Sequence, residues 1–231
     1  NMGSVAYNAL NLTDNLGAYA LSGGTTVVPL TYVDGSILYY LNGVLQPAPT
    51  VSGTDTLVIE DINLPPNSTA TFIYEARANE FAPMEMDAQI INTVTTNGGA
   101  GIGEISDTAT VSVEETAKLT IAKAICPTVL NDNEPLTYTI VVQNLGNKPI
   151  IATDGVVISD VFDPVLSELT VTLNGAPLVE GTDYTYNATT GEFATVNGVI
   201  TVPAATYIQD PISGTITTTP GVTTVTVVGT V

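Results

Sequence analysis

The sequence predicts an all-β chain made of two tandem antiparallel β-sandwich repeats. Two observations carry this prediction. Short stretches rich in Thr and Val alternate between polar and apolar residues, and pairs of turn-forming residues separate these stretches. The 231 residues are enough for two domains, and no segment shows the 3.6-residue apolar period of a helix.

The predicted strands follow one another with a turn signal between them. The clearest alternating stretches are residues 69–78, 108–113, 136–142, 169–173 and 222–228. The turns are predicted at Asp34-Gly35, Asn42-Gly43, Asn97-Gly98-Gly99, Asp154-Gly155, Asn174-Gly175 and Asn197-Gly198. Many short strands at this spacing are typical of an immunoglobulin-like sandwich.

The two halves of the chain repeat the same motifs in the same order. The matched pairs are Asn1-Met2-Gly3 with Asn144-Leu145-Gly146, Leu12-Thr13-Asp14 with Ile158-Ser159-Asp160, Leu41-Asn42-Gly43 with Leu173-Asn174-Gly175, and Ile62-Asn63-Leu64-Pro65 with Ile200-Thr201-Val202-Pro203. Diverged copies of one domain give such a pattern. The sequence therefore predicts repeat one at 1–113, a linker at 114–117 and repeat two at 118–231.

The two repeats begin and end at different strands of the shared pattern. Repeat two opens with predicted strands at 118–125 and 136–143, before its Asn-Leu-Gly motif, whereas repeat one begins directly at Asn-Met-Gly. Repeat one ends with predicted strands at 89–95 and 106–113, which have no equivalent in repeat two. We therefore expect the first repeat to lack its first two strands and the second to lack its last. Flanking repeats of a longer parent or neighbouring subunits would supply them.

Composition excludes several classes of function. The net charge is −19, and the four basic residues, Arg77, Lys118, Lys123 and Lys148, form no patch in the sequence. A chain this acidic repels phosphate backbones and anionic lipid, so we expect no nucleic-acid partner. No apolar run approaches the roughly 20 residues that a membrane span needs.

Catalysis and cofactor binding are not expected either. The chain has no His and a single Cys, Cys126, which we expect to be a half-buried thiol near a strand end, with no base to activate it. We expect no enzyme activity and no small-molecule substrate. Loop oxygens could hold Ca²⁺, but their spacing matches no known site, so solvated turns are the favoured interpretation; these residues are Asn131, Asp132, Asn133 and Glu134, and separately Asp154 and Asp163.

Four polar side chains fall on predicted core-facing positions. Lys123 shares the face of its strand with Leu119, Ile121 and Ile125, because side chains two residues apart point the same way. By the same alternation Asp160, Asp14 and Asn92 also lie on apolar faces. Burying an unpaired charge costs several kcal/mol, so these groups require partners.

The residues Leu119-Thr120-Ile121-Ala122-Lys123, the run from Leu136 to Gly146, and Val157-Ile158-Ser159-Asp160 together resemble a known repeat. It is the conserved "domain of unknown function" repeat of large Gram-positive surface proteins, which is related to Cna-type collagen-adhesin stalk domains. The closing strand, Ile91-Asn92-Thr93-Val94-Thr95, has Val where that family usually has Ala. The resemblance implies an extracellular, cell-surface location and a role in a stalk or fibre.

The related stalk domains also imply a chemistry for the four polar residues. They form a spontaneous amide bond between a buried Lys and an Asn, assisted by a carboxyl group. By resemblance, Lys123 would supply the amine, Asn92 the acceptor carboxamide, and Asp160 and Asp14 the assisting acids. A non-covalent buried cluster and a misread strand face remain alternatives, and neither repeat contains a complete Lys-acid-Asn triad.

Two functions follow as expectations. The first is a structural repeat of a bacterial extracellular filament, pilus-like fibre or surface-protein stalk, whose partners are copies of itself or neighbouring repeats. The alternative is an adhesin module that binds a host or matrix ligand. A binding module needs a concave site with convergent polar or aromatic groups, whereas a spacer needs contacts only at its ends.

Overall fold

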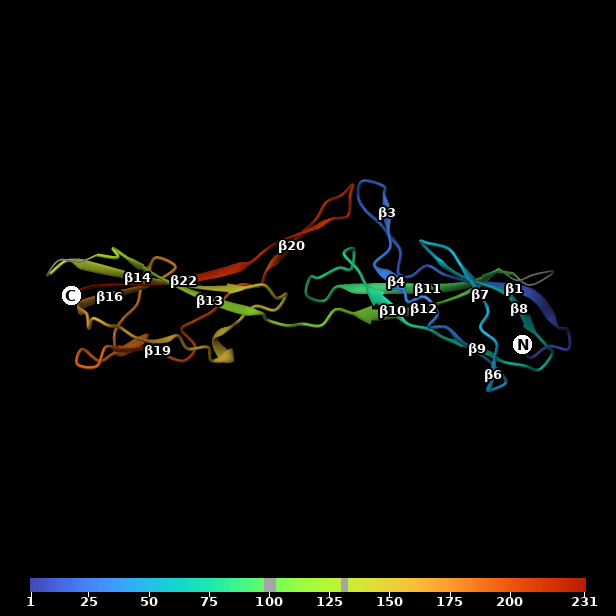
Figure 1. Ribbon diagram of the computed structural model, residues 1–231, viewed down its shortest axis with the longest axis horizontal. Coiled ribbons are helices and arrows are strands. Elements are labelled where there is room, and N and C mark those ends of the chain that lie inside the picture. The colour runs from blue at the N-terminus through green and yellow to red at the C-terminus, as the bar shows by residue number, and fades with distance from the viewer. Residues whose placement is uncertain (98–102, 130–132) are drawn as a thin grey trace. The chain divides into compact units, whose positions relative to one another are not determined.

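A computed structural model describes residues 1–97, 103–129 and 133–231 of the chain. The predicted all-β fold class is confirmed: the described residues form strands β1 to β22 in several antiparallel sheets, with one short 3₁₀ turn at Ala152–Asp154 (Figure 1). Two compact units make up the chain. Unit 1 contains Asn1–Val113 and Ile208–Thr217, and unit 2 contains Glu114–Tyr207 and Thr218–Val231.

This division differs from the predicted boundaries at two places. Residues 208–217, which were expected in repeat two, belong to unit 1. The expected linker at 114–117 belongs to unit 2, where the Thr116 N–H donates to Asn147 Oδ1 at 2.9 Å. Both differences arise from long-range contacts, which short-range strand and turn patterns do not encode.

Unit 1 contains one large sheet and one small sheet that matter for the site. The large sheet has the order β12-β11-β1-β8-β7, with strands at Ile105–Ser112, Gln89–Asn97, Tyr7–Asp14, Leu57–Leu64 and Thr50–Ser52. The small sheet has the order β6-β5-β9, with strands at Val44–Gln46, Leu38–Leu41 and Ala70–Ile73. Two short pairs complete the unit: β10 (Ala76–Ala78) with β4 (Leu30–Tyr32), and β2 (Tyr19–Ala20) with β3 (Thr26–Val27).

Unit 2 also contains one large sheet and one small sheet. Its large sheet has the order β13-β14-β22-β16-β17, with strands at Leu119–Cys126, Pro135–Asn144, Gly221–Thr230, Ser167–Leu173 and Ala176–Pro177. Its small sheet has the order β15-β19-β18, with strands at Ser159–Val161, Glu192–Thr195 and Tyr184–Tyr186. The remaining strands, β20 (Thr206–Gln209) and β21 (Ile216–Thr219), form a hairpin whose residues 208–217 belong to unit 1.

The repeated motifs have the same structure in both units. In unit 1 the Asn42 N–H donates to the Thr69 carbonyl, and the Asn42 side chain accepts from the Thr69 N–H, both at 2.9 Å. Asn174 and Thr224 make the same two bonds in unit 2 at 2.8 Å. These turns join β5 to β6 and β16 to β17, so β9 in unit 1 corresponds to β22 in unit 2.

The cores differ in size. In unit 2 a cluster of fourteen buried apolar residues centres on Phe162, Phe193, Leu136 and Val227, each at most 2% exposed. The corresponding cluster among the described residues of unit 1 has six, centred on Leu57 and Ile59. Apolar burial is the main favourable contribution to folding, so unit 2 has the stronger core.

The Ile208–Thr217 segment docks within unit 1 through close backbone contacts. The Gly23 N–H donates to the Pro211 carbonyl at 3.1 Å, and Gln209 Nε2 donates to the Tyr19 hydroxyl at 2.7 Å. Gly214 has φ +75°, and a Cβ there would lie 2.8 Å from Val27 and 3.0 Å from Phe81. The segment therefore depends on a glycine at position 214.

We predict that Gly214→Ala lowers the free energy of unfolding of unit 1 by about 1–3 kcal/mol, because the added methyl group overpacks this contact. Gly43→Ala is the control, because Gly43 has φ +78° with nothing within 4 Å and so adds only backbone strain. Hydrogen exchange over residues 208–217 should be faster in Gly214→Ala than in Gly43→Ala. Equal exchange in the two variants would contradict the docking contact.

Candidate functional site

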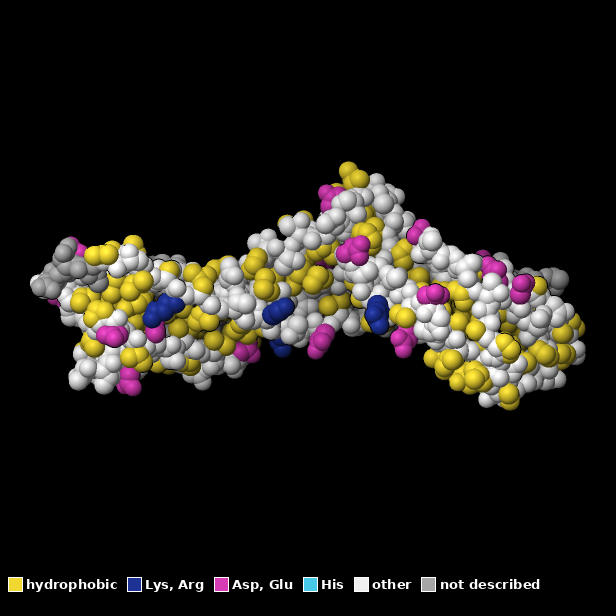
Figure 2. Space-filling view, viewed as in Figure 1, with side chains coloured by type: hydrophobic (Ala, Val, Ile, Leu, Met, Phe, Trp, Pro, Cys, Tyr) yellow, Lys and Arg dark blue, Asp and Glu magenta, His cyan; other side chains and the backbone are white. Residues whose placement is uncertain are grey.

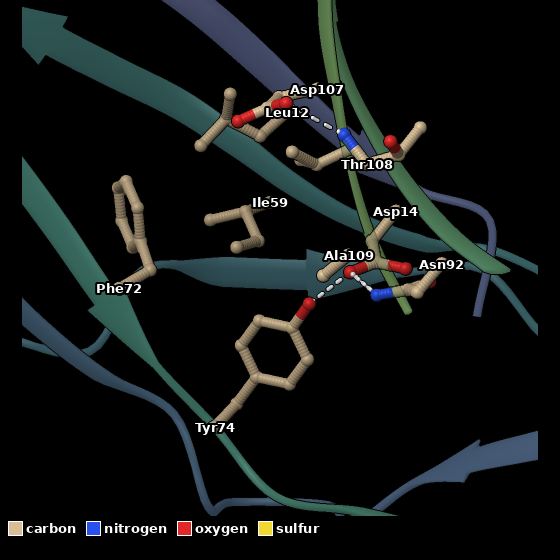
Figure 3. A pocket seen from close by; sticks show the side chains of 10 residues that line it. Leu12, Asp14, Ile59, Phe72, Tyr74, Asn92, Asp107, Thr108 and Ala109 are labelled. Atoms are coloured by element: carbon tan, nitrogen blue, oxygen red, sulfur yellow. Dashed lines mark hydrogen bonds between the residues drawn. The ribbon is translucent and has the colours of Figure 1, made fainter. Parts of the chain in front are cut away.

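The candidate site in unit 1 is a buried carboxylate that two side chains contact. Asp14 lies at the end of β1 and is 3% exposed. Asn92 of β11 donates to Asp14 Oδ2 at 2.9 Å, and the Tyr74 hydroxyl, just beyond β9, donates to the same oxygen. Figure 3 shows the three side chains pointing toward one another from different segments of the chain. The Leu16 N–H donates to the other Asp14 oxygen at 2.7 Å, so both carboxylate oxygens are hydrogen-bonded.

A cavity of about 360 Å³ lies beside this cluster. Its walls come from both sheets of unit 1: the apolar residues Leu12, Ile59, Phe72, Val94 and Ala109 line it together with Asp14, Tyr74, Asn92, Asp107 and Thr108 (Figure 3). In a complete sandwich the inner faces of the two sheets interdigitate and leave little space. The cavity is therefore a place where the core of unit 1 is open.

The carboxamide of Asn92 is held at both ends. Its Nδ2 donates to Asp14, and its Oδ1 accepts from the Gly17 N–H at 3.0 Å. A backbone N–H aimed at a carbonyl oxygen stabilises negative charge that develops there during nucleophilic attack. The arrangement thus presents an acid and a polarised amide, and no lysine of this unit contacts them, since Arg77 is the only basic residue within 1–113.

Tyr74 has a strongly raised pKa. Burial is the largest cause, and the hydrogen bond to Asp14 and the charge of Asp14 add to it. A tyrosine whose pKa is raised in the folded state stabilises the fold fully below its unfolded pKa of about 10, and this stability is lost as pH rises through the folded pKa. Unit 1 should therefore lose stability at strongly alkaline pH.

We predict that the urea midpoint of unit 1 falls between about pH 10 and 11, and that Tyr74→Phe removes part of this fall because it has no ionisable hydroxyl. Burial also raises the pKa values of three tyrosines in unit 2, Tyr138, Tyr184 and Tyr207. The contribution of Tyr74 must therefore be measured by comparing Tyr74→Phe with the unsubstituted chain. Tyr40→Phe, outside the cavity lining, is the control. The same alkaline fall in all three proteins would refute the assignment.

The candidate site in unit 2 is an ion pair whose ammonium lies over two aromatic rings. Lys123 Nζ of β13 lies 2.6 Å from Asp160 Oδ2 of β15, and the two side chains are 41% and 19% exposed. The ammonium also lies 4.5 Å from the centre of the Tyr138 ring and 5.5 Å from that of Phe162, as in cation–π contacts. The structure therefore brings Lys123 and Asp160 together on the inner face of unit 2.

The expectation that the apolar face of β13 is buried is wrong. Leu119, Ile121 and Ile125 are 39%, 64% and 41% exposed, and the other residues of β13 are exposed as well. β13 is the edge of the five-stranded sheet, and the opposing small sheet has only three strands. The inner face of β13 is therefore largely uncovered within the described part of unit 2, apart from the contact between Lys123 and Asp160 of β15.

The sequence-predicted residues thus form two separate pairs, one in each unit. Asp14 and Asn92 meet in unit 1, and Lys123 and Asp160 meet in unit 2. Sequence reasoning missed Tyr74, which donates to Asp14, and Gly17, whose N–H donates to Asn92. The signal for Tyr74 was its place in the alternating stretch 69–78, which the structure divides into β9 and β10 with Tyr74 between them.

The remaining sequence expectations concern isolated residues. Cys126 ends β13 and is exposed, not half-buried, because the edge strand has no cover. Asn131 and Asp132 lie outside the described residues, and among the residues that are described no three His, Cys, Asp or Glu side chains form a metal-binding group. Within those same residues, no helix has the length and apolar character to cross a bilayer.

Comparisons with known proteins identify no family. No family model matches the chain, and no curated protein matches its sequence. Among solved structures, the N-terminal domain of an adhesin from Streptococcus gordonii matches with 11% identity and a TM-score of 0.27. The match covers 97% of this chain and 49% of the other, so the chain spans about half the length of that structure. The function must therefore be argued from the residues of this chain.

Proposed function

We propose that this chain is a structural segment of a bacterial extracellular fibre or surface-protein stalk, and that neighbouring segments join by strand complementation. The observation that carries the proposal is that each unit lacks two strands that the other unit has. Each has one five-stranded sheet facing a three-stranded sheet, and one edge strand of each small sheet, β9 in unit 1 and β15 in unit 2, lies where the other unit has two further strands. Each edge offers unpaired backbone groups to an added strand.

Exposed apolar side chains beside these edges support the proposal. β12 and β13, which form the edges of the large sheets, are eight residues long and exposed throughout. Ile105 and Val111 of β12 are 59% and 54% exposed, like Ile121 of β13. Figure 2 shows hydrophobic side chains over much of the visible surface and few Lys or Arg. Strands added at β9 and β15 would cover the inner faces of β12 and β13 and bury this surface.

We predict that the purified chain self-associates and that Ile121→Lys weakens association at least tenfold. Burying one Ile contributes about 1.5–3 kcal/mol, and about 1.4 kcal/mol corresponds to a tenfold change. Ile151→Lys is the matched control, because Ile151 is 52% exposed in a loop and the substitution adds the same charge. Light scattering and negative-stain electron microscopy measure association. A chain that remains monomeric at high concentration would remove the proposal.

We further propose that assembly permits an amide bond between Lys123 of one segment and Asn92 of another. The neutral Nζ attacks the Asn92 Cγ, the new C–N bond replaces the bond to Nδ2, and ammonia leaves with a proton from the amine. The Gly17 N–H and Asp14 already contact the Asn92 carboxamide and are placed to stabilise the developing charge. The Lys123–Asp160 pair holds the amine on an uncovered inner face.

Boiled samples of assembled protein test this bond directly. A ladder of multimers on a denaturing gel, with one ammonia lost per junction by intact mass, is the expected result. Lys123→Arg and Asn92→Ala should each give monomers only, because the first removes the amine nucleophile and the second removes the carboxamide that it attacks. Monomers only from the unsubstituted chain would exclude the bond and leave non-covalent assembly standing.

The cavity in unit 1 favours one alternative, an adhesin module that binds a host or matrix ligand. It is concave, and its polar groups Asp14, Tyr74 and Asn92 converge beside Phe72. Sites for ligands have this character. Binding of monomeric chain to immobilised collagen, lost on Ala109→Trp in the cavity wall, would favour this alternative over the structural role.

A further inference from the structure

The arrangement around Asn1 in unit 1 repeats that around Asn144 in unit 2. The Asn144 side chain accepts from the Gly146 N–H at 2.9 Å and donates to the carbonyls of Lys148 and Pro203. The Asn1 side chain likewise accepts from the Gly3 N–H at 2.9 Å and donates to the carbonyls of Val5 and Pro65. Asn1 therefore occupies in unit 1 the position that ends β14 in unit 2.

The backbone at Asn1 begins a strand pairing with the segment that leads into β9. Its amino group donates to the Ser68 carbonyl at 2.8 Å, and the Ser68 N–H donates back to the Asn1 carbonyl at 3.1 Å. Two residues that exchange both bonds form one rung of an antiparallel ladder. In unit 2 the corresponding ladder runs the full length of β14 along β22, whereas β9 pairs only with β5 in the described part of unit 1.

The cavity beside β9 has the chemistry to receive β13 as well as β14. In unit 2, Asp160 pairs with Lys123 of β13, and the inward row of β14 supplies Leu136, Tyr138, Ile140 and Val142. Asp14 occupies the matching position in unit 1 and makes no ion pair with a described residue. Asp107 adds a second carboxylate to a cavity that is otherwise largely apolar. An apolar strand with one inward lysine complements this lining in both charge and shape.

Resting on the proposed structural role, we infer that unit 1 binds a hairpin of the β13–β14 type. The second strand of this hairpin pairs with β9, and its last residue lies next to Asn1. The inward lysine of its first strand lies at Asp14. The hairpin provides the two strands that unit 1 lacks relative to unit 2. It pairs the free edge of β9 and covers the inner face of β12. The lysine gives Asp14 the cation that Asp160 already has.

A peptide of residues 118–143, labelled with fluorescein and carrying Cys126→Ser, tests the inference in solution with the full chain. It stops before Asn144 because Asn1 already fills that position. We expect saturable binding by anisotropy, with slower hydrogen exchange over Ala70–Ile73 in the protein. Lys123→Met in the peptide should weaken binding about tenfold, because a buried charge pair is lost.

Two protein variants localise the binding. Ala109→Trp fills the cavity and should weaken binding tenfold or more, whereas Thr110→Trp on the opposite face of β12 should not. Absence of binding, equal binding to both variants, or protection only in unit 2 would overturn the inference. If the chain still self-associates while the peptide does not bind, the inference alone fails. If the peptide binds a chain that never self-associates, the proposed function fails and the site stands.

Discussion

Replacing Asn144 with Ala is expected to lower the free energy of unfolding of unit 2 by about 3–5 kcal/mol, because each buried polar group left without a partner costs about 1–3 kcal/mol. The Asn144 side chain is fully buried and makes four hydrogen bonds. It accepts from the backbone N–H groups of Lys118 and Gly146 and donates to the carbonyls of Lys148 and Pro203. Alanine leaves all four backbone groups without this partner.

Two further variants separate the hydrogen bonds from simple loss of volume. Asn144→Asp keeps an acceptor for both N–H groups but cannot donate to the two carbonyls, and it adds a buried charge, so it should be at least as damaging as Ala at neutral pH. Asn1→Ala removes the similar pattern from unit 1, where the side chain is only partly buried, and should cost less. Chemical denaturation followed by a fluorophore on the exposed Cys126 reports unit 2. A loss below 1 kcal/mol for Asn144→Ala would contradict the network.

The sequence predicts the fold class and the repeat, because both depend on short-range patterns. Alternation at 136–142 identifies β14, and the Asn-Gly turns at 42–43 and 174–175 identify the β5–β6 and β16–β17 hairpins. The Asn-x-Gly motif marked Asn1 and Asn144 as equivalent. Their hydrogen bonds could not be predicted, because the partners Pro65 and Pro203 lie far along the chain and their positions depend on tertiary packing.

The sequence also predicts four residues of the two candidate sites, but not Tyr74 or Gly17, and not how the sites are covered. Alternation correctly places Asp14 and Asp160 on inner faces, with Asn92 and Lys123 as their respective contacts. It cannot show that the apolar side chains of β13 are left exposed, because the burial of a face depends on the opposing sheet. The docking of Ile208–Thr217 in unit 1 was missed for a related reason: Val27 and Phe81, the neighbours of Gly214, lie more than 100 residues earlier in the sequence.

Phe162→Ala is expected to destabilise unit 2 by about 3–5 kcal/mol, since large-to-small substitution in a packed core loses both transfer energy and contacts across a cavity. Phe162 is 1% exposed, and its ring lies 4.6 Å from that of Tyr138, 5.4 Å from Phe193 and 6.1 Å from Tyr186. It also lies beneath the Lys123 ammonium. Phe162→Leu keeps much of the volume and should cost less than Ala.

Phe72→Ala in unit 1 is the informative comparison, because Phe72 lines the open cavity and stacks on Tyr39 at 4.8 Å while remaining partly exposed. Its loss should cost about 1 kcal/mol in the isolated chain, in proportion to the area it buries. If a hairpin completes unit 1, Phe72 becomes fully buried, and the same substitution should cost more in the presence of the 118–143 peptide. Calorimetry of both variants with and without peptide measures this difference. An unchanged cost for Phe72→Ala on adding a bound peptide would mean that the cavity is not the place where the hairpin packs.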